Sequence, residues 1–415
     1  MTPATPAAFT LSVEVDGVAA SPDASGRYVV RPGQSVAVRS NHDATWSGND
    51  LGSGVTRTER DTGNAQWISR FANPSPGAPG SYRLTAGASG GRTLTLDFTV
   101  QTGDYRNGEY MLYAANGTRQ KLTINFDTAT YSTTDGTGGV ESGTLTAPAG
   151  PATDWTVHSA RIAGFNAASL RSLGDTIVGA LPFRVPSAAP GTFAVYPFIA
   201  TRAFLLSANR LDGVFNRLQI QYLTGGGRQS AISQLGVFDG GTVMKQCSHL
   251  TIHEIDTCPA ASVVTSRLEP DPDNSGLWLM KHPTTNALMG RIGIAEINGE
   301  KIYLSGGASP SDGSQLLSIG LPSQTRVPTF TSSGWSTDGT LDSVVATPTT
   351  YDIDHDTGAI STHNLTLNTI SPPGLHLLSD GTQHYFMIRS QTLELAVAAR
   401  NSTLRPGFLH IGVLH

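Results

Sequence analysis

The chain of 415 residues is 38% hydrophobic and 14% charged, with a formal net charge of −5. This length suits about two to four domains, and the lack of a basic run argues against binding to nucleic acid or to anionic lipid. No uncharged apolar stretch is long enough for a membrane span, because the longest candidate, Phe193 to Leu206, is interrupted by Pro197 and Arg202.

Alternation of apolar and polar residues dominates the chain, as in Phe9–Val15 and Leu94–Val100. A period of two is typical of strands with one buried and one exposed face. Asp-Gly and Asn-Gly dipeptides separate these runs, and both residue types tolerate the positive φ of two-residue hairpin loops. The dipeptides begin at Asp16, Asn107, Asn116, Asp135, Asp239, Asn298, Asp338 and Asp380. One segment, from Asn166 to Gly174, favours a helical turn. The chain is therefore predicted to be all-β.

Residues 1–102 contain about seven short predicted strands with a turn every ~8–12 residues, the spacing of a β-sandwich. The segments Val30–Val38 and Gly80–Leu84, with Trp46 between them and Leu96–Val100 after them, resemble the bacterial immunoglobulin-like domains of surface and secreted proteins. The resemblance implies an N-terminal two-sheet sandwich with Trp46 in its core. Because the two core cysteines of antibody-type domains are absent, Trp46 would pack without a disulfide behind it.

Beyond residue 102 the sequence repeats itself weakly, which predicts an antiparallel β-meander unit used two or three times, as barrels or as sandwiches. Loose Pro- and Gly-rich stretches at 185–191 and 306–313 mark the predicted boundaries. The predicted units are 103–185, 186–308 and 309–415. The similar segments are Gly108–Tyr113 and Gly191–Tyr196, Phe126–Tyr131 and Phe238–Val243, and Gly174–Val178, Gly299–Tyr303 and Gly381–Tyr385. Chance matching in a chain rich in glycine and threonine is the alternative.

Two cysteines, Cys247 and Cys258, stand eleven positions apart. So close a pair predicts one local disulfide in an exported protein. One alternative is a pair of reduced, buried cysteines in a cytosolic protein. Another is a zinc site in which His249 and His253 complete a set of two cysteines and two histidines.

The chain opens Met1-Thr2-Pro3, without the charged and apolar regions of a signal peptide. We interpret this Pro- and Thr-rich start as what remains after a secretion signal has been removed. Together with the cysteine pair, it predicts an extracellular or cell-surface location.

Three further motifs favour turns over chemistry. Gly87–Gly91 has the Gly-x-Ser-x-Gly pattern of a hydrolase nucleophile, but a strand is predicted after it where a helix is required. Asp271–Gly276 opens like an EF-hand loop, yet His282 stands where the bidentate Glu belongs. Asp352–Gly358 has its glycine one residue late for calcium and suits a hairpin. The sequence therefore predicts no catalytic residue, no metal site and no cofactor.

A long β chain with few charges has many strand edges, which natural proteins must cover or use. We therefore expect a non-catalytic extracellular or cell-surface protein that acts by binding, as in adhesion, or by self-assembly. Assembly would give a filament or surface array through β-strand pairing, with Ala7–Val13 as the predicted donor strand. The partner would be a second copy, a surface glycan or a protein.

The alternative is a secreted carbohydrate-active enzyme with an accessory immunoglobulin-like module. Such an enzyme would need two carboxylates about 5–10 Å apart in a cleft. The predicted cleft is lined by Trp155, Trp278 or Trp335.

Overall fold

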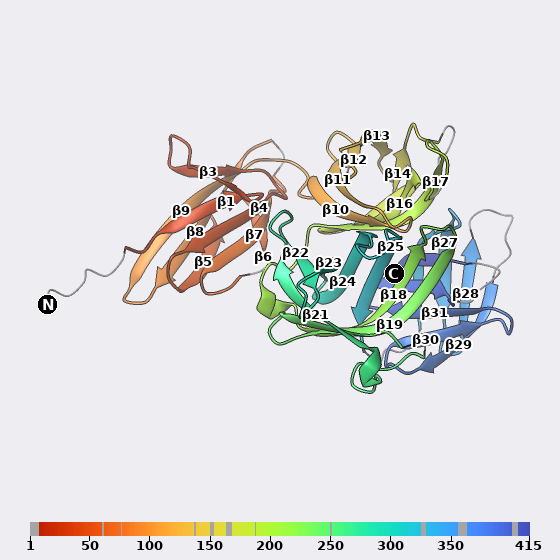
Figure 1. Cartoon of the computed structure of the whole chain (residues 1–415). Coiled ribbons are helices and arrows are strands. Elements are labelled where there is room, and N and C mark those ends of the chain that lie inside the picture. Colours follow the sequence, from red (N-terminus) through yellow and green to blue (C-terminus); the bar gives the residue numbers. More distant parts are fainter. Residues whose placement is uncertain are drawn as a thin grey trace. The chain divides into compact units, whose positions relative to one another are not determined.

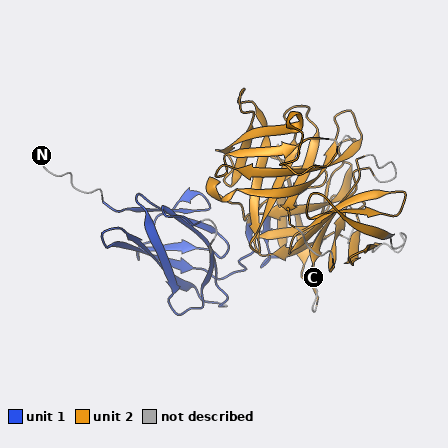
Figure 2. Ribbon diagram, turned by 90° about the horizontal axis from the view of Figure 1, so that it is seen from below, with its two compact units in different colours: residues 1–108, 123–129 blue, residues 109–122, 130–415 orange. Residues whose placement is uncertain are grey.

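Strands dominate this computed structural model, as the alternating sequence pattern predicts (Figure 1). In the part of the chain that the structure describes, they are accompanied by two short 3-10 helices, η1 (Ala208–Arg210) and η2 (Ala260–Ser262). The chain divides into two compact units, residues 1–108 with 123–129 and residues 109–122 with 130–415 (Figure 2). The structure describes residues 8–59, 62–75, 77–136, 138–149, 153–162, 168–186, 188–249, 251–324, 329–355, 363–400 and 406–415. Within these ranges, no helix has the length and apolar character needed to cross a membrane.

The first unit contains the predicted β-sandwich, which is built from two sheets. One sheet has the strand order β2-β1-β4-β7-β6 and the other has the order β3-β9-β8-β5. Strand β3 runs parallel to β9, and the other described pairs are antiparallel. The strands are β1 (Leu11–Val15), β2 (Val18–Ala19), β3 (Arg27–Val30), β4 (Ser35–Ser40), β5 (Ala44–Asp50), β6 (Thr56–Glu59), β7 (Gln66–Ala72), β8 (Gly80–Ala88) and β9 (Arg92–Val100).

The tryptophan at the centre of the sandwich is Trp67, whereas the resemblance predicted Trp46. Trp67 is fully buried, stacks on Phe98 and contacts Phe71 at a tilt, at ring-centroid distances of 6.4 and 6.0 Å. Trp46 is only partly buried, and its Nε1 donates to the carbonyl of Gly63 at 3.0 Å. The reason is strand position, since β7 lies between two strands of its sheet while β5 is at an edge.

The repeated meander is present three times, and each copy is a closed eight-stranded barrel. Each strand pairs with the next along the chain, and the eighth pairs with the first, which is an up-and-down topology. The first barrel contains β10 (Gly108–Ala114), β11 (Arg119–Asn125), β12 (Thr130–Thr134), β13 (Val140–Thr146), β14 (Trp155–His158), β15 (Ser169–Leu173), β16 (Thr176–Arg184) and β17 (Phe193–Thr201). The second contains β18 (Gly213–Tyr222), β19 (Arg228–Phe238), β20 (Val243–Cys247), β21 (Val263–Pro270), β22 (Leu277–Lys281), β23 (Leu288–Ile297), β24 (Glu300–Ala308) and β25 (Gln315–Pro322). The third contains β26 (Phe330–Ser336), β27 (Leu341–Ala346), β28 (Thr350–His355), β29 (His363–Ile370), β30 (Leu375–Ser379), β31 (His384–Arg389), β32 (Leu393–Ala398) and β33 (Leu409–Leu414).

The barrels differ from the predicted units at the boundaries near 185 and 308. Strand β17 follows the first boundary but pairs with β16 and with β10, so it completes the first barrel. Strand β25 follows the second boundary but pairs with β24 and β18. The Pro- and Gly-rich stretches are therefore hairpin connections inside barrels. Composition cannot distinguish such a connection from a linker, because both are loose and polar.

Two of the similar segment pairs occupy equivalent places in the first and second barrels. Phe126–Tyr131 and Phe238–Val243 span the turn between the second and third strands, and Gly174–Val178 and Gly299–Tyr303 open the seventh strand. Gly108–Tyr113 lies on a first strand and Gly191–Tyr196 leads into an eighth, while Gly381–Tyr385 opens a sixth strand, so these are not equivalent. The predicted helical turn is wrong where the structure describes it, since Ser169–Leu173 form β15; Asn166 lies outside the described residues.

The predicted disulfide joins Cys247, the last residue of β20, to Cys258 in the loop before η2. The Cα atoms of the two residues are 5.8 Å apart. Because both sulfur atoms are used in this bond, the two-cysteine, two-histidine zinc site does not form, although the rings of His249 and His253 do lie together with centroids 4.9 Å apart.

Candidate functional site

The interior of an eight-stranded barrel is just wide enough for side chains to fill it. A charged side chain on an inward position must therefore find a partner there, or a ligand, because burying an unpaired charge is costly. The second and third barrels both bury ionisable side chains. The two barrels differ in whether these buried side chains have partners of opposite charge. On this difference we distinguish a structural network, in the third barrel, from a candidate site, in the second.

The third barrel holds a buried network centred on Asp342 and His410. The Asp342 carboxylate lies 2.8 Å from Nδ1 of His355 and 3.2 Å from Nδ1 of His410. The other ring nitrogen of His410, Nε2, lies 3.1 Å from the carboxylate of Glu394. The Tyr351 hydroxyl donates to that second carboxylate at 2.7 Å. One imidazole thus bridges two carboxylates.

The network controls the charge of its members. Burial alone would lower the pKa of His410, but the charge of Glu394 and the hydrogen bond to Asp342 outweigh it and raise this pKa to about 10. Burial likewise acts to raise the pKa of Asp342, yet hydrogen bonds from His355 and His410 hold it well below its usual range. A Cβ on Gly412 would lie 2.5 Å from Glu394 Oε2, so the absence of a side chain at that position makes room for the network.

This network is closed to any substrate. Asp342, Glu394 and His410 are all fully buried. The cavity described in this barrel has a volume of about 10 Å³ and an entirely apolar and aromatic lining, including Leu365 and Phe408. Such a volume holds about one water molecule. We conclude that the network stabilises the barrel.

A separate buried histidine in the same barrel, His376, predicts a loss of stability in acid. Burial, with the nearby charge of Arg389, lowers its pKa from 6.5 to about 4. As the pH falls, the unfolded chain binds the proton before the folded chain does. The contribution of His376 to stability is therefore complete above pH ~6.5 and is lost as the pH falls toward ~4, by up to about 3 kcal/mol in total. Chemical denaturation of His376→Gln across this pH range should show a flatter profile than the wild type. An unchanged profile would contradict the assignment.

Three layers of inward-facing side chains line the polar half of the second barrel. The deepest contains Arg217, Gly320 and Tyr303, which are paired across β18, β25 and β24. The next layer contains Gln219, Ser318 and Ser305 on the same strands. The outermost contains Gln221, Leu316 and Gly307 on these strands, and Met280 and Gly290 at the corresponding position on β22 and β23. Phe215, the inward position before Arg217 on β18, belongs to an apolar cluster with Leu235 and Trp278, against which Met280 also packs.

Arg217 is buried without an acidic partner among the described residues. The residue is 8% exposed. Its Nη1 donates to Oε1 of Gln246 at 3.2 Å, whereas its Nε–H has no hydrogen-bond partner. Burial lowers the pKa of the Arg217 guanidinium, but an arginine remains charged in proteins. A formal positive charge thus lies inside the barrel without a described counter-charge.

The Arg217 side chain lines a cavity of about 90 Å³ at this end of the barrel. Polar groups of Gln219, Gln246 and Ser318 also line this cavity. Its rim includes Ala308 and Pro310, both exposed, so the cavity opens at the β24–β25 hairpin. A guanidinium at the base of an open, polar cavity is suited to binding an anion, above all a carboxylate or phosphate group that can accept two parallel hydrogen bonds.

Two of the three tryptophans proposed for a sugar-binding cleft are buried inside barrels. Trp278 and Trp335 are 3% and 2% exposed, so neither can line an open surface. Trp278 packs in the apolar half of the second barrel. The Nε1 of Trp335 donates to the Ser169 hydroxyl at 3.1 Å. Trp155 lies on β14 and is partly buried.

The proposed calcium loop is organised by the chain itself. Asp271 has a fully buried carboxylate that pairs with Nε of Arg291 at 2.9 Å and accepts a hydrogen bond from Asn274 at 3.0 Å. Of the second acidic run, Asp352 and Asp354 lie on β28, and residues 356–358 lie outside the described part. In the ranges that the structure describes, no three His, Cys, Asp or Glu side chains gather so as to hold a metal ion.

Two other predicted features also have structural roles. Gly87–Gly91 spans the β8–β9 hairpin, as expected, with positive φ at Gly90 and Gly91. The predicted donor strand is already in use, since Leu11–Val15 forms β1 and is hydrogen-bonded to β2 on one side and β4 on the other. Ala7 lies outside the described residues.

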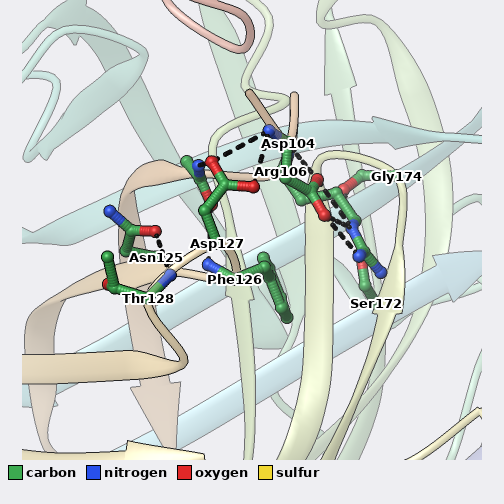
Figure 3. A network of polar contacts seen from close by, with 9 residues as sticks. Asp104, Arg106, Asn125, Phe126, Asp127, Thr128, Ser172 and Gly174 are labelled. Atoms are coloured by element: carbon green, nitrogen blue, oxygen red, sulfur yellow. Dashed lines mark hydrogen bonds and ion pairs between the residues drawn. The ribbon is translucent and has the colours of Figure 1, made fainter. Parts of the chain in front are cut away.

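A pair of carboxylates in the first unit is likewise satisfied by its neighbours (Figure 3). Asp127 accepts hydrogen bonds from the backbone N–H of Asp104 at 3.1 Å and from the side-chain amide of Asn107 at 2.7 Å. Asp104 in turn pairs with Arg106, whose guanidinium lies 4.3 Å from the ring centroid of Phe126. These contacts fix the segment that follows the sandwich, and we assign them a structural role.

Sequence reasoning missed Arg217. A signal was present, because the inward positions of Phe215–Gln221 read Phe, Arg, Gln, Gln and thus change from apolar to charged and polar along one face. Reading that signal requires knowing which face points inward, and the outward positions Leu218 and Ile220 are the more apolar.

No protein-family model and no curated protein matches this chain. Among solved structures it is similar to a DUF4784 family protein from Bacteroides caccae, with 11% sequence identity over 94% of this chain and 93% of that one, at a TM-score of 0.18. That similarity is too low to bear on what this chain binds.

Proposed function

We propose that this chain is a non-catalytic, exported binding protein whose second barrel takes a small ligand through an anionic group. The observation that carries the proposal is the buried Arg217, which has no described counter-charge and lines a cavity open at one end of the barrel. The mouths of β-barrels are common binding sites for small molecules. The third barrel provides the internal comparison, because the buried charges of its network are matched by partners within the fold.

The predicted export rests on the sequence and on the disulfide of the second barrel. A disulfide persists in oxidising compartments and is rare in the cytosol. The bond between Cys247 and Cys258 is therefore in keeping with an extracellular or cell-surface binding protein.

The test is calorimetric titration of the full chain with acetate and with inorganic phosphate at fixed ionic strength. We expect the wild type to bind at least one of these anions, and Arg217→Met to weaken binding about tenfold or more, since a charge-assisted hydrogen bond contributes ~1.5–3 kcal/mol. Arg267→Met is the matched control, because Arg267 is an exposed arginine of the same barrel, paired with Glu269. Binding that survives Arg217→Met, or no binding to the wild type, would overturn the proposal.

Self-assembly by strand pairing and a glycan or protein partner remain predictions of the sequence. Use of the N-terminal segment as a donor would require β1 to leave its two neighbours in the sandwich. Analytical ultracentrifugation of the full chain, with and without residues 1–14, would test such assembly directly.

A further inference from the structure

The outermost layer of the cavity differs in character from the layers beneath it. Met280, Met289 and Leu316 line it, and all three are partly exposed. Methionine side chains are flexible and are favoured at surfaces that adapt to apolar ligands. Ala308, Ser309 and Pro310 continue the lining to the rim. These three apolar side chains, Met280, Met289 and Leu316, lie in the lining of the cavity together with the polar Ser309, and we define them as the apolar collar.

The charge available at the base of the cavity is a single unit. The other arginine of the lining, Arg291, pairs with the buried carboxylate of Asp271, with Nε and Oδ2 2.9 Å apart. Among the described residues of the lining, Arg217 is thus the one left to neutralise a ligand, and one positive charge balances a monoanion better than a phosphate dianion. A carboxylate also matches a guanidinium in shape, accepting two parallel hydrogen bonds.

The size of the cavity limits what can be enclosed. A volume of about 90 Å³ accommodates a carboxylate and a few carbons, well below the ~300–1,000 Å³ of pockets that enclose a whole drug-sized ligand. Anything larger must extend outward past the collar. The path is also long, because Ala308 lies five residues beyond Tyr303, and Tyr303 is level with Arg217. Five residues of strand span about 16 Å.

We infer that the ligand is a monocarboxylate with a slender apolar chain, bound with its carboxylate at Arg217 and its chain against the collar. This inference rests on the proposed function, and it adds the chemical class and the orientation of the ligand. The guanidinium supplies the charge pairing, and the collar removes the chain from water.

A series of straight-chain carboxylates tests the inference: acetate, butyrate, hexanoate and octanoate, titrated below their micellar concentrations into the full chain. We expect affinity to rise about three- to fourfold for each methylene that reaches the collar, the usual effect of burying a CH₂ group. Inorganic phosphate should bind more weakly than hexanoate. Arg217→Met should weaken the whole series by a similar factor.

Gly290→Leu tests the collar separately from the arginine. A Cβ on Gly290 would lie 2.6 Å from Cε of Met280, the flexible end of that side chain, so the variant fills the mouth without displacing backbone. It should weaken octanoate about tenfold or more and change acetate little. Gly225→Leu is the control, because a Cβ there meets nothing within 4 Å and Gly225 is not part of the cavity lining. Circular dichroism melts would confirm that both variants fold.

The outcomes separate the inference from the proposed function. If acetate binds in an Arg217-dependent manner but longer chains bind no better, or if phosphate binds more tightly than hexanoate, the inference is wrong and the proposed function stands. If octanoate binds equally well to Gly290→Leu and to the wild type, the collar is not the path of the chain and the inference is wrong. If no anion binds, or Arg217→Met has no effect, both fail.

Discussion

Replacement of Asp342 by asparagine should lower the free energy of unfolding by about 3–5 kcal/mol, the usual cost of breaking a buried pair of charges. Asparagine has nearly the same shape as aspartate, so packing is kept while the charge is lost. His410 then loses one of the two carboxylates that keep it protonated, and His355 faces a neutral amide at the position of its 2.8 Å contact. With all of these groups fully buried, water cannot compensate.

Urea denaturation at neutral pH measures the effect, with Asp354→Asn as the control. Asp354 lies on β28 of the same barrel but is exposed, so its loss should change stability by less than about 0.5 kcal/mol. The pH dependence of the free energy of unfolding gives a second test. Because the pKa of His410 is raised to about 10, its contribution is complete below pH ~6.5 and is lost as the pH rises through ~10. The difference between wild type and Asp342→Asn should therefore shrink in strong alkali. Equal stability of the two at neutral pH would contradict a stabilising role for the network.

Replacement of Arg217 by methionine should act in the opposite direction and raise the free energy of unfolding by about 1–2 kcal/mol. The substitution would remove a buried charge that has no described counter-charge, and apolar replacements of buried ionic groups are often neutral or stabilising. A methionine side chain is flexible enough to pack against the apolar cluster below. A residue retained at a cost in stability is characteristic of a functional site.

The same denaturation experiment, run without ligand, distinguishes this role from a structural one. If Arg217 were a structural element, Arg217→Met would be destabilised relative to the Arg267→Met control. A gain in stability combined with loss of anion binding is expected only of a site that awaits a ligand. A loss of more than about 1 kcal/mol would count against the proposal even if binding were also lost.

Local chemistry made much of the fold predictable. Strand alternation such as that of Leu94–Val100 predicts a strand because a period of two places apolar groups on one face, and β9 covers this segment. Asp16, Asp239 and Asn298 adopt positive φ between strands, at 50°, 57° and 50°, as their Asp-Gly and Asn-Gly dipeptides indicate. The disulfide was predictable for the same reason, since an eleven-residue separation brings two cysteines together within one local loop.

By itself, then, the sequence determined the class of secondary structure, the hairpins and the disulfide, all of which depend on neighbours along the chain. Only the tertiary structure decided that β10 closes onto β17, that β18 closes onto β25, and that the repeated units are barrels. It also decided which face of β18 points inward, and hence that Arg217 lies in a cavity. In the third barrel it decided that Asp342 and Glu394 share one histidine, His410. The physical reason is that the alternating pattern gives a strand two different faces. It does not specify which residues pack against each face. The energetic role of a buried charge depends entirely on partners far away in the sequence.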